Sequence, residues 1–343
     1  MELPGVVRPL DSSKPGISYP GTSSLFDEVW LEDNAEIAQH ISRYFGQVFS
    51  SIEPTISDWE HGVEALPCKV DSDMNSELLK PYTAEEVTNA ISHMARLKSP
   101  GPNAFEINHF LRIKNWGKMR HMALKLDISN AYDKVEWSFL RQVLFKLRFH
   151  AHFVNLVILY VSSVSYSFIL SGRQFGNIVP SRGIRQGDPL SPYLFLLYTE
   201  ALGSLISQAE MIGQLKGICV SRNAPSIFHL LFVDDTILCC EASVEAMECI
   251  QSILQVYRKA FGQEINLQKS VVVFNKNTPE LTMTNISAGL GIWRADRHDK
   301  YLGLPSVVGH TKKWFLIPSG IAFGNELARG VKNNCLKLAM RFL

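Results

Sequence analysis

Two adjacent aspartates, Asp234 and Asp235, interrupt an otherwise apolar stretch, and no other feature of the chain constrains its local fold as strongly. The stretch runs from His229 to Cys240, with Leu-Leu-Phe-Val before the acids and Ile-Leu-Cys-Cys after Thr236. Short apolar runs separated by turn-tolerant residues are typical of a β-hairpin, and aspartate tolerates the backbone geometry of a turn. The pattern therefore predicts two strands with a bend at the acids.

The paired charges at this bend admit two interpretations. Two like charges 4 Å apart repel each other by about 1 kcal/mol in water and by more where water is scarce. A divalent cation bound between them would turn this repulsion into attraction. A solvated turn without a ligand is the alternative, and the two acids taken alone favour it.

The size and charge of the chain set broad limits. Its 343 residues are enough for roughly two domains and a sizeable core. The net charge is +1, so the overall charge gives no argument for nucleic-acid binding. Residues 101–150, however, hold nine Lys and Arg against four acids, a local excess that suits phosphate contacts. A solvated basic face would have the same composition.

The cysteines and the apolar stretches indicate an intracellular protein without a membrane span. None of the six cysteines forms a CxxC pair, and a chain of this length needs no disulfides to fold, so a reduced compartment is expected. The two most apolar stretches, 153–170 and 190–206, are interrupted by polar residues and are shorter than a clean span of about 20 apolar residues. Both are interpreted as core elements.

Apolar periodicity predicts both helices and strands. Residues 1–30, rich in Pro, Gly and Ser, are expected to be irregular. Spacings of three and four residues indicate helices over 37–48, 83–98, 137–147, 191–205 and 243–261, and short apolar runs indicate strands over 124–128, 166–170 and 271–274. Asp188 or Ser191 is expected to cap the fourth helix, with Pro189 or Pro192 at its first position.

A third carboxylate, Asp127, strengthens the metal-binding interpretation of Asp234 and Asp235. It lies at the end of the strand expected over 124–128, where side chains face a cleft. If this strand lies beside the hairpin, Asp127, Asp234 and Asp235 converge. Three carboxylates can hold two Mg²⁺ ions about 3.5–4 Å apart, an arrangement that serves in-line phosphoryl transfer. Taken alone, Asp127 is equally explained as a strand-end or helix-capping acid.

Several segments in a fixed order resemble the reverse transcriptases of non-LTR, LINE-type retrotransposons of the plant type. The resemblance covers roughly residues 30–315 and rests most on the second and third motifs, SRGIRQGDPLSPYLF and HLLFVDDTILCC. The matching segments are 85–102, 124–140, 181–195, 229–240, 265–274 and 301–305.

This resemblance implies an α+β fold, a polymerase palm in which helices back an antiparallel sheet, with residual fingers and a partial thumb. It divides the chain into an N-terminal linker and helical region (1–82), a residual fingers segment (83–123), the palm (124–275) and a partial thumb or connection (276–343). The implied activity is RNA-directed DNA polymerisation with an RNA template, a DNA primer and dNTPs. Action in the nucleus is implied only by the family's habit of copying RNA at chromosomal sites.

The resemblance also implies the metal ligands and one proton donor. Asp127 and Asp234, with Asp235 beside them, would hold two Mg²⁺ ions, for which Mn²⁺ could substitute. Lys269 occupies the place of a proposed general acid for the leaving pyrophosphate; without the resemblance it would be an ordinary surface lysine.

Four further residues would contact the incoming nucleotide or the template. Tyr132 lies where the family places a bulky gate against a ribose 2′-hydroxyl, although as bare sequence it is an ordinary core tyrosine. Arg185, Gln186 and Gly187 would line the nucleotide and the template, with Gly187 allowing close approach.

The sequence departs from the family pattern between Pro102 and Glu106. A long fingers segment is missing there, and the pattern also fades after about Phe323. Because phosphoryl transfer depends mainly on positioning, we expect weak or no polymerisation by this chain. The alternative function is an inactive truncated relic that at most binds nucleic acid. A metal-dependent nuclease is disfavoured because residues 181–195 would then be unexplained.

Overall fold

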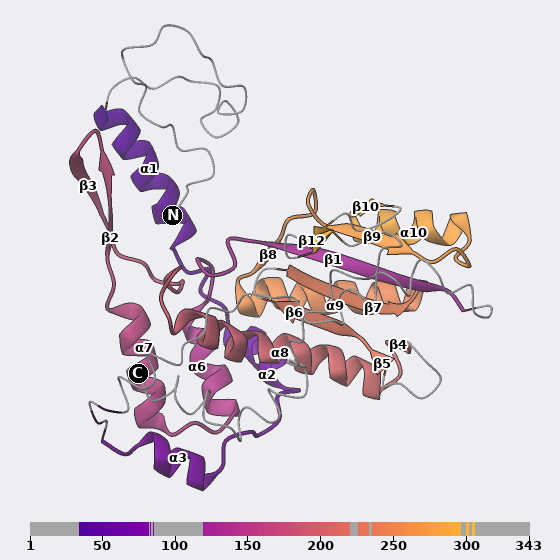
Figure 1. Cartoon of the computed structure of the whole chain (residues 1–343), viewed down its shortest axis with the longest axis horizontal. Coiled ribbons are helices and arrows are strands. Elements are labelled where there is room, and N and C mark those ends of the chain that lie inside the picture. The colour runs from indigo at the N-terminus through magenta and orange to yellow at the C-terminus, as the bar shows by residue number, and fades with distance from the viewer. Residues whose placement is uncertain are drawn as a thin grey trace, which may run out of the picture.

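A computed structural model describes residues 34–81, 83, 85, 119–219, 226–232, 235–295, 300, 301, 304 and 305. Figure 1 shows a twisted sheet with helices against it and, apart from the sheet, an arm formed by helix α1 and a hairpin. The predicted irregular region 1–30 and nearly all of the helix predicted over 83–98 lie outside the described residues.

The central sheet is built around strand β1 (His121–Ser129), the longest of its strands. Its main path has the order β10-β9-β1-β7-β6, and β8 also pairs with β1. Every pairing is antiparallel except that of β10 with β9. The other members are β6 (His229–Phe232), β7 (Asp235–Glu241), β8 (Glu264–Ile265), β9 (Val271–Phe274) and β10 (Trp293–Arg294).

Alternate positions of the sheet enter two separate hydrophobic clusters. Met122, Leu124 and Leu126 belong to the large core that the helices share, whereas Ala123 belongs to a small cluster with Ile237 on the other face. This alternation follows from the two-residue period of a strand. The helices therefore cover one face of the sheet, which confirms the expected α+β architecture.

The helices behind the sheet come from distant parts of the chain. Helix α9 (Val244–Phe261) contacts α2 (Ile56–Val63), α8 (Ser191–Met211) and α10 (Glu280–Leu290), and α6 (Trp137–Lys146) contacts α7 (Ala151–Ser162). Helix α2 thus shares the core with α6, α8 and α9 although it lies far from them in the sequence. None of the helices in the described ranges combines the length and the apolar character needed to cross a membrane.

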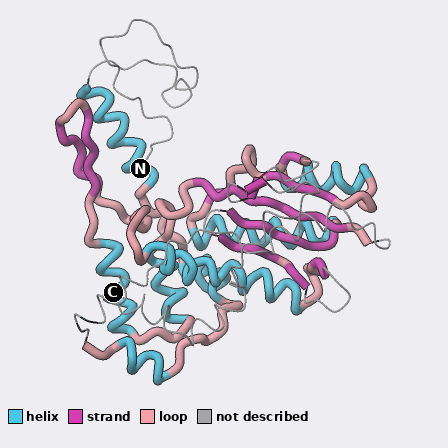
Figure 2. The backbone as a smooth tube through the Cα atoms, in the orientation of Figure 1, coloured by secondary structure: helices cyan, strands magenta, loops and turns pink. Residues whose placement is uncertain are grey.

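The remaining elements are short. Helix α1 (Asn34–Val48) packs on strand β3 (Arg173–Ile178), which forms a hairpin with β2 (Tyr166–Leu170), and Figure 2 shows this arm beside the main body. Helix α3 and the small two-stranded pairs are the other described elements: α3 (Ser72–Leu78), β4 (Ile218–Cys219) with β5 (Ser226–Ile227), and β11 (Lys300–Tyr301) with β12 (Leu304–Pro305).

Most of the predicted elements within the described residues are confirmed, but the predicted cap of α8 is wrong. Leu190 occupies the N-cap position, no side chain caps the helix, and Ser191 is already helical. The Asp188 carboxylate instead accepts a hydrogen bond from the Leu190 N–H at 2.9 Å. Pro192 lies in the first turn of α8. The N–H groups of a first turn have no acceptor within the helix, so a proline there costs no helical hydrogen bond.

A buried carboxylate joins three distant segments behind the sheet. Glu136, fully buried, accepts hydrogen bonds from the Ser51 hydroxyl at 2.5 Å and from the Ile52 N–H at 3.2 Å. It also pairs with Arg182 at 3.2 Å between Oε1 and Nη1, and Arg182 in turn donates from Nε to the Val48 carbonyl at 2.8 Å. The pair therefore connects the N-terminal region to the segment before α8.

The C-terminal end of α9 packs directly against the same carboxylate. Gly262 ends the helix in the left-handed conformation, with φ +67°. A Cβ at this position would lie 2.7 Å from Glu136 Cγ, so any larger residue would collide with the ion pair as well as strain the backbone. Tyr198 adds a bridge, because its hydroxyl accepts from the Glu136 N–H and donates to the Phe261 carbonyl.

We predict that Glu136→Gln lowers the free energy of unfolding by about 3–5 kcal/mol, because it leaves the Arg182 charge buried without its partner. The measurement is urea unfolding followed by circular dichroism. Arg182→Met should cost a similar amount. The double variant Glu136→Gln/Arg182→Met should cost clearly less than the sum of the two single changes, since no unpaired charge remains. Strict additivity would contradict this account of the pair.

Candidate active site

The two strands of the predicted hairpin are present and paired with each other. Strand β6 ends at Phe232 and β7 begins at Asp235, and these two residues are paired. The connection therefore consists of residues 233 and 234 only. The two predicted strands are confirmed, with Asp235 at the start of the second strand, whereas Asp234 lies outside the described residues.

The register of the sheet brings two of the predicted site positions together. Asp127, near the end of β1, is the direct cross-strand partner of Asp235. Directly opposite positions in an antiparallel pair have Cβ atoms about 4.5–5.5 Å apart. Position 127 also has the same parity as Ala123, and position 235 the same as Ile237, so both acids occupy positions on the sheet face opposite the core that the described helices share.

A turn beyond β8 holds the backbone of Asp127 from both sides. Its N–H donates to Ser270 Oγ at 3.1 Å, and its carbonyl accepts from the Asn266 N–H at 2.8 Å. Lys269 lies in this same turn and is exposed, and its N–H donates to the Asn266 carbonyl and side chain, each at 3.2 Å. The structure therefore brings Lys269 to the end of β1 at which Asp127 stands.

The chemistry of this strand end suits a hard divalent cation. Carboxylate oxygens are the ligands that Mg²⁺ prefers, and two aspartate positions face each other here. Among the side chains that the structure describes, no three of His, Cys, Asp and Glu form a metal-binding group. The third predicted carboxylate, Asp234, lies outside the described residues.

The second motif is attached to the segment that follows β1. The Gly183 N–H donates to the Val135 carbonyl and the Ile184 N–H to the Tyr132 carbonyl, both at 2.8 Å. Gly183 has φ +98°, and an added Cβ would lie 2.8 Å from the Asp133 carbonyl oxygen. Only glycine therefore fits this close approach of the two motifs.

Tyr132 is half-buried, as a residue between core and site would be. Its ring stacks on Phe195 of α8, with the centroids 5.0 Å apart and the planes inclined by 14°. The ring orientation is thus set by packing. The main-chain bond to Ile184 fixes the same residue to the second motif.

The Arg185–Gln186–Gly187 loop is exposed, and its residues differ in how they are held. Arg185 lies over the Tyr160 ring, with its guanidinium carbon 5.1 Å from the ring centroid. Gln186 Nε2 lies 3.5 Å from Asp133 Oδ2, a long hydrogen bond. Gly187 has φ +83° and no heavy atom within 4 Å of an added Cβ, so its conformation rather than close packing favours glycine.

Sequence reasoning missed Asp133, Tyr160 and Asp188 as members of this region. Asp133 directly follows Tyr132 in the first motif, so its place there was a usable signal. Tyr160 offered none, because it lies in α7 outside every motif and reaches the loop only in the folded chain. Burial raises the pKa of the Asp133 carboxyl to about 6, against a smaller opposing effect of the Lys134 charge.

The largest effect of pH on stability in this region should come from Asp133. Because its folded pKa lies above the ordinary 3.8, the folded chain holds a proton that the unfolded chain has lost between pH 3.8 and about 6. Stability contributed by this group is therefore present below pH 3.8 and declines as pH rises to about 6.

We predict that Asp133→Asn raises the urea midpoint relative to the unmodified chain at pH 7, and that this advantage shrinks as pH falls to 4. The asparagine has no charge to bury, which is the physical reason. Urea unfolding at a series of pH values measures the difference. Asp73→Asn, at an exposed position of α3, is the control. A difference that does not change with pH would contradict the assignment.

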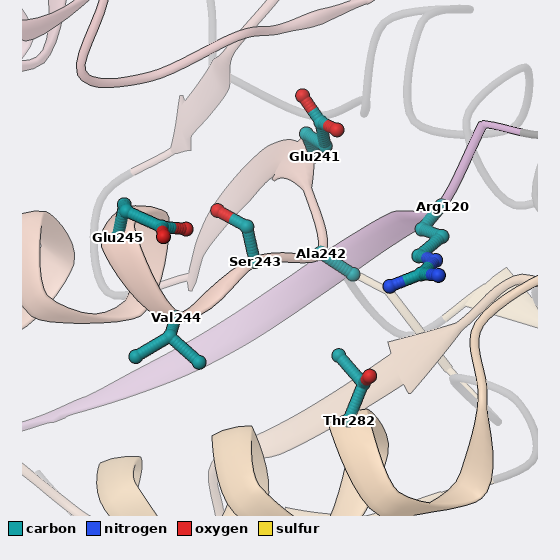
Figure 3. Close-up of a pocket in the computed structure, with 7 residues that line it drawn as sticks. All are labelled: Arg120, Glu241, Ala242, Ser243, Val244, Glu245 and Thr282. Atoms are coloured by element: carbon teal, nitrogen blue, oxygen red, sulfur yellow. The ribbon is translucent and has the colours of Figure 1, made fainter.

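A shallow pocket at the other end of the sheet is separate from this site. Its volume is about 290 Å³, and it lies where β7 ends and α9 begins. In Figure 3, Arg120 and Glu245 lie on opposite sides of Ala242, and Glu241 lies above it. The pairing of His121 with Glu241 places this pocket at the opposite end of β1 from the pairing of Asp127 with Asp235.

Comparison with known proteins gives a family match over most of the chain. The model of the reverse transcriptase (RNA-dependent DNA polymerase) family matches residues 72–305. An uncharacterized mitochondrial protein of Arabidopsis thaliana is 59% identical over 69 residues, which are 20% of this chain and 57% of that protein.

Two proteins of animal transposable elements are more distant relatives. The Pol polyprotein of the type-2 retrotransposable element R2DM of Drosophila melanogaster is 28% identical over 163 residues, 48% of this chain and 15% of that protein. The 149 kDa protein of transposon TX1 of Xenopus laevis is 26% identical over 192 residues, 56% of this chain and 14% of that protein. The chain thus spans only part of each relative. With the family model covering residues 72–305, the chain belongs to the reverse transcriptase (RNA-dependent DNA polymerase) family.

Proposed function

We propose that this chain carries out RNA-directed DNA synthesis, joining a deoxynucleotide to a primer 3′-hydroxyl opposite an RNA template. The observation that carries the proposal is the direct pairing of positions 127 and 235 on the sheet face opposite the helical core. A solvated turn would not require a second aspartate on the neighbouring strand. Membership of the reverse transcriptase family supports the same reaction.

Asp127, Asp234 and Asp235 are the residues that would hold two divalent ions, Mg²⁺ or Mn²⁺ in its place. When bound, such ions lower the pKa of the primer hydroxyl and offset the charge of the departing pyrophosphate. The backbone of Asp127 is fixed by hydrogen bonds to Asn266 and Ser270, so its carboxylate starts from a defined position. Such preorganisation is the main contribution that a protein makes to phosphoryl transfer.

The other proposed roles concern the triphosphate. Arg185, Gln186 and Gly187 would bind the nucleotide and the template, and Arg185 has the planar, permanently charged group that suits phosphate oxygens. Lys269 would donate a proton to the pyrophosphate as the bond between the α-phosphorus and the leaving oxygen breaks. Its exposed side chain stands on the turn that carries the backbone of Asp127.

We predict that Asp127→Asn lowers primer extension on an RNA template more than about a hundredfold, since loss of a second-shell partner alone costs roughly 10–100-fold. The measurement is extension of a labelled DNA primer with dNTPs and Mg²⁺, repeated with Mn²⁺. Asp73→Asn, an exposed change of the same kind on α3, should leave the rate unchanged.

The extension assay also separates the proposal from the inactive alternative. The junction between Pro102 and Glu106 makes the expected rate of the unmodified chain low. If the unmodified chain and Asp127→Asn are equally inactive while both still bind a primer–template duplex, the chain is a nucleic-acid-binding relic and the proposed reaction is excluded.

We predict that Tyr132→Val raises the use of ribonucleotides relative to deoxynucleotides by about tenfold or more, because the ring would no longer exclude a 2′-hydroxyl. The measurement is the ratio of kcat/KM for a dNTP and the matching rNTP. This ratio is unaffected by the fraction of folded protein, which matters because the ring also packs on Phe195. An unchanged ratio would show that Tyr132 does not exclude the ribose 2′-hydroxyl.

A further inference from the structure

We propose that Tyr160 of α7 is a positioning residue for nucleotide binding, which holds the 185–188 loop so that Arg185 can meet the incoming triphosphate. The inference rests on the proposed function for the role of Arg185. It goes beyond that function because Tyr160 lies outside all the motifs and is connected to the loop only by tertiary contacts.

The first contact is between Tyr160 and the end of the loop. The Tyr160 hydroxyl donates a hydrogen bond to Asp188 Oδ2. The other carboxylate oxygen of Asp188 accepts from the Leu190 N–H at 2.9 Å. Asp188 is largely buried, with 10% of its side chain exposed, so these two donors define its position. Tyr160 thereby connects α7 to the residues that lead into α8.

The second contact is between Tyr160 and the start of the loop. The guanidinium carbon of Arg185 lies 5.1 Å from the centre of the Tyr160 ring, within the range of a cation–π interaction. The Arg185 side chain is nevertheless 42% exposed, so part of it is available to a ligand. One tyrosine therefore contacts both ends of the loop, by its hydroxyl and by its ring face.

The hydroxyl also limits how closely Arg185 pairs with Asp188. Arg185 Nε lies 3.8 Å from Asp188 Oδ2, the oxygen that accepts from Tyr160. This distance is too long for a good hydrogen bond. If the hydroxyl were removed, Oδ2 would be free to bind the guanidinium directly. Arg185 would then be drawn toward Asp188 and away from a phosphate.

The middle of the loop cannot hold this pose by its own packing. Gln186 and Gly187 are exposed, and no heavy atom lies within 4 Å of a Cβ built on Gly187. The 3.5 Å contact of Gln186 with Asp133 is long for a hydrogen bond. Burial raises the pKa of Tyr160, and the bond to Asp188 raises it further, so the hydroxyl remains a donor throughout the neutral range.

The test uses Tyr160→Phe in the full chain, which keeps the ring and removes the hydroxyl. In primer extension on an RNA template, we expect the KM for the dNTP to rise roughly tenfold while kcat changes less than about twofold, since the lost bond to a charged group acts on binding. The matched control is Tyr257→Phe, because within the described residues the Tyr257 hydroxyl is buried without a hydrogen-bond partner. This control should retain both kinetic constants.

A second measurement does not depend on activity. Hydrogen–deuterium exchange of a peptide covering residues 183–190 reports the loop directly, because the Leu190 N–H is held by Asp188. We expect at least about threefold faster exchange in Tyr160→Phe than in the unmodified chain, and no change in Tyr257→Phe.

The two measurements distinguish failure of this inference from failure of the proposed function. If exchange becomes faster in Tyr160→Phe but the unmodified chain extends no primer, the proposed function fails and the connection of Tyr160 to the loop remains. If Tyr160→Phe keeps the exchange of the unmodified chain and, in an active chain, its KM as well, the positioning role is overturned.

Discussion

The buried carboxylate of Glu136 is the constraint on which much of this structure depends. A charge removed from water must be matched by donors, and here the donors come from Ser51, Ile52 and Arg182. These residues belong to the N-terminal region and to the segment before α8, so neither can move without exposing or unpairing the charge. Gly262 closes the arrangement, since only a residue without a Cβ fits beside the carboxylate at the end of α9.

The central sheet has two faces with different surroundings, and this difference determines where the acids lie. Alternate residues of β1 enter the helix-covered core, and the residues between them occupy the opposite face. Near the end of β1, Asp127 has the same alternation as Ala123 and therefore lies on this opposite face. Its cross-strand partner is Asp235. The positions of both acids therefore stand on a backbone fixed by core packing, on the face opposite the helical core. A carboxylate on the other face would have been buried among apolar side chains.

The loop that carries Arg185 is positioned by a different principle. Its start is held by main-chain hydrogen bonds from Gly183 and Ile184 to the segment after β1. Its exposed middle has little packing, and its end depends on Asp188 and Tyr160. The end of the site that is proposed to hold metal is thus built from the regular sheet, whereas the end proposed to bind the nucleotide depends on a few side-chain contacts between α7 and the loop. Binding loops commonly need such separate anchors, because a loop lacks a hydrogen-bond ladder of its own.

Local pattern was sufficient to predict the hairpin at Asp234 and Asp235, the helix that begins after Ser243 and the strand over Val271–Phe274, because short-range periodicity and capping chemistry determine such elements. Motif order likewise indicated the reverse transcriptase family. The predicted cap of α8 failed because Asp188, which the sequence offers as a cap, bonds to Leu190 and Tyr160 instead.

Only the tertiary structure decided that Asp235 stands opposite Asp127, that Asp133 is buried, and that Tyr160 reaches the loop. Strand register, burial and contacts between distant helices depend on how the whole chain packs, and a local sequence pattern contains none of that information. The chain by itself therefore determined which elements form and which family they indicate. The packing of those elements determined which side chains meet.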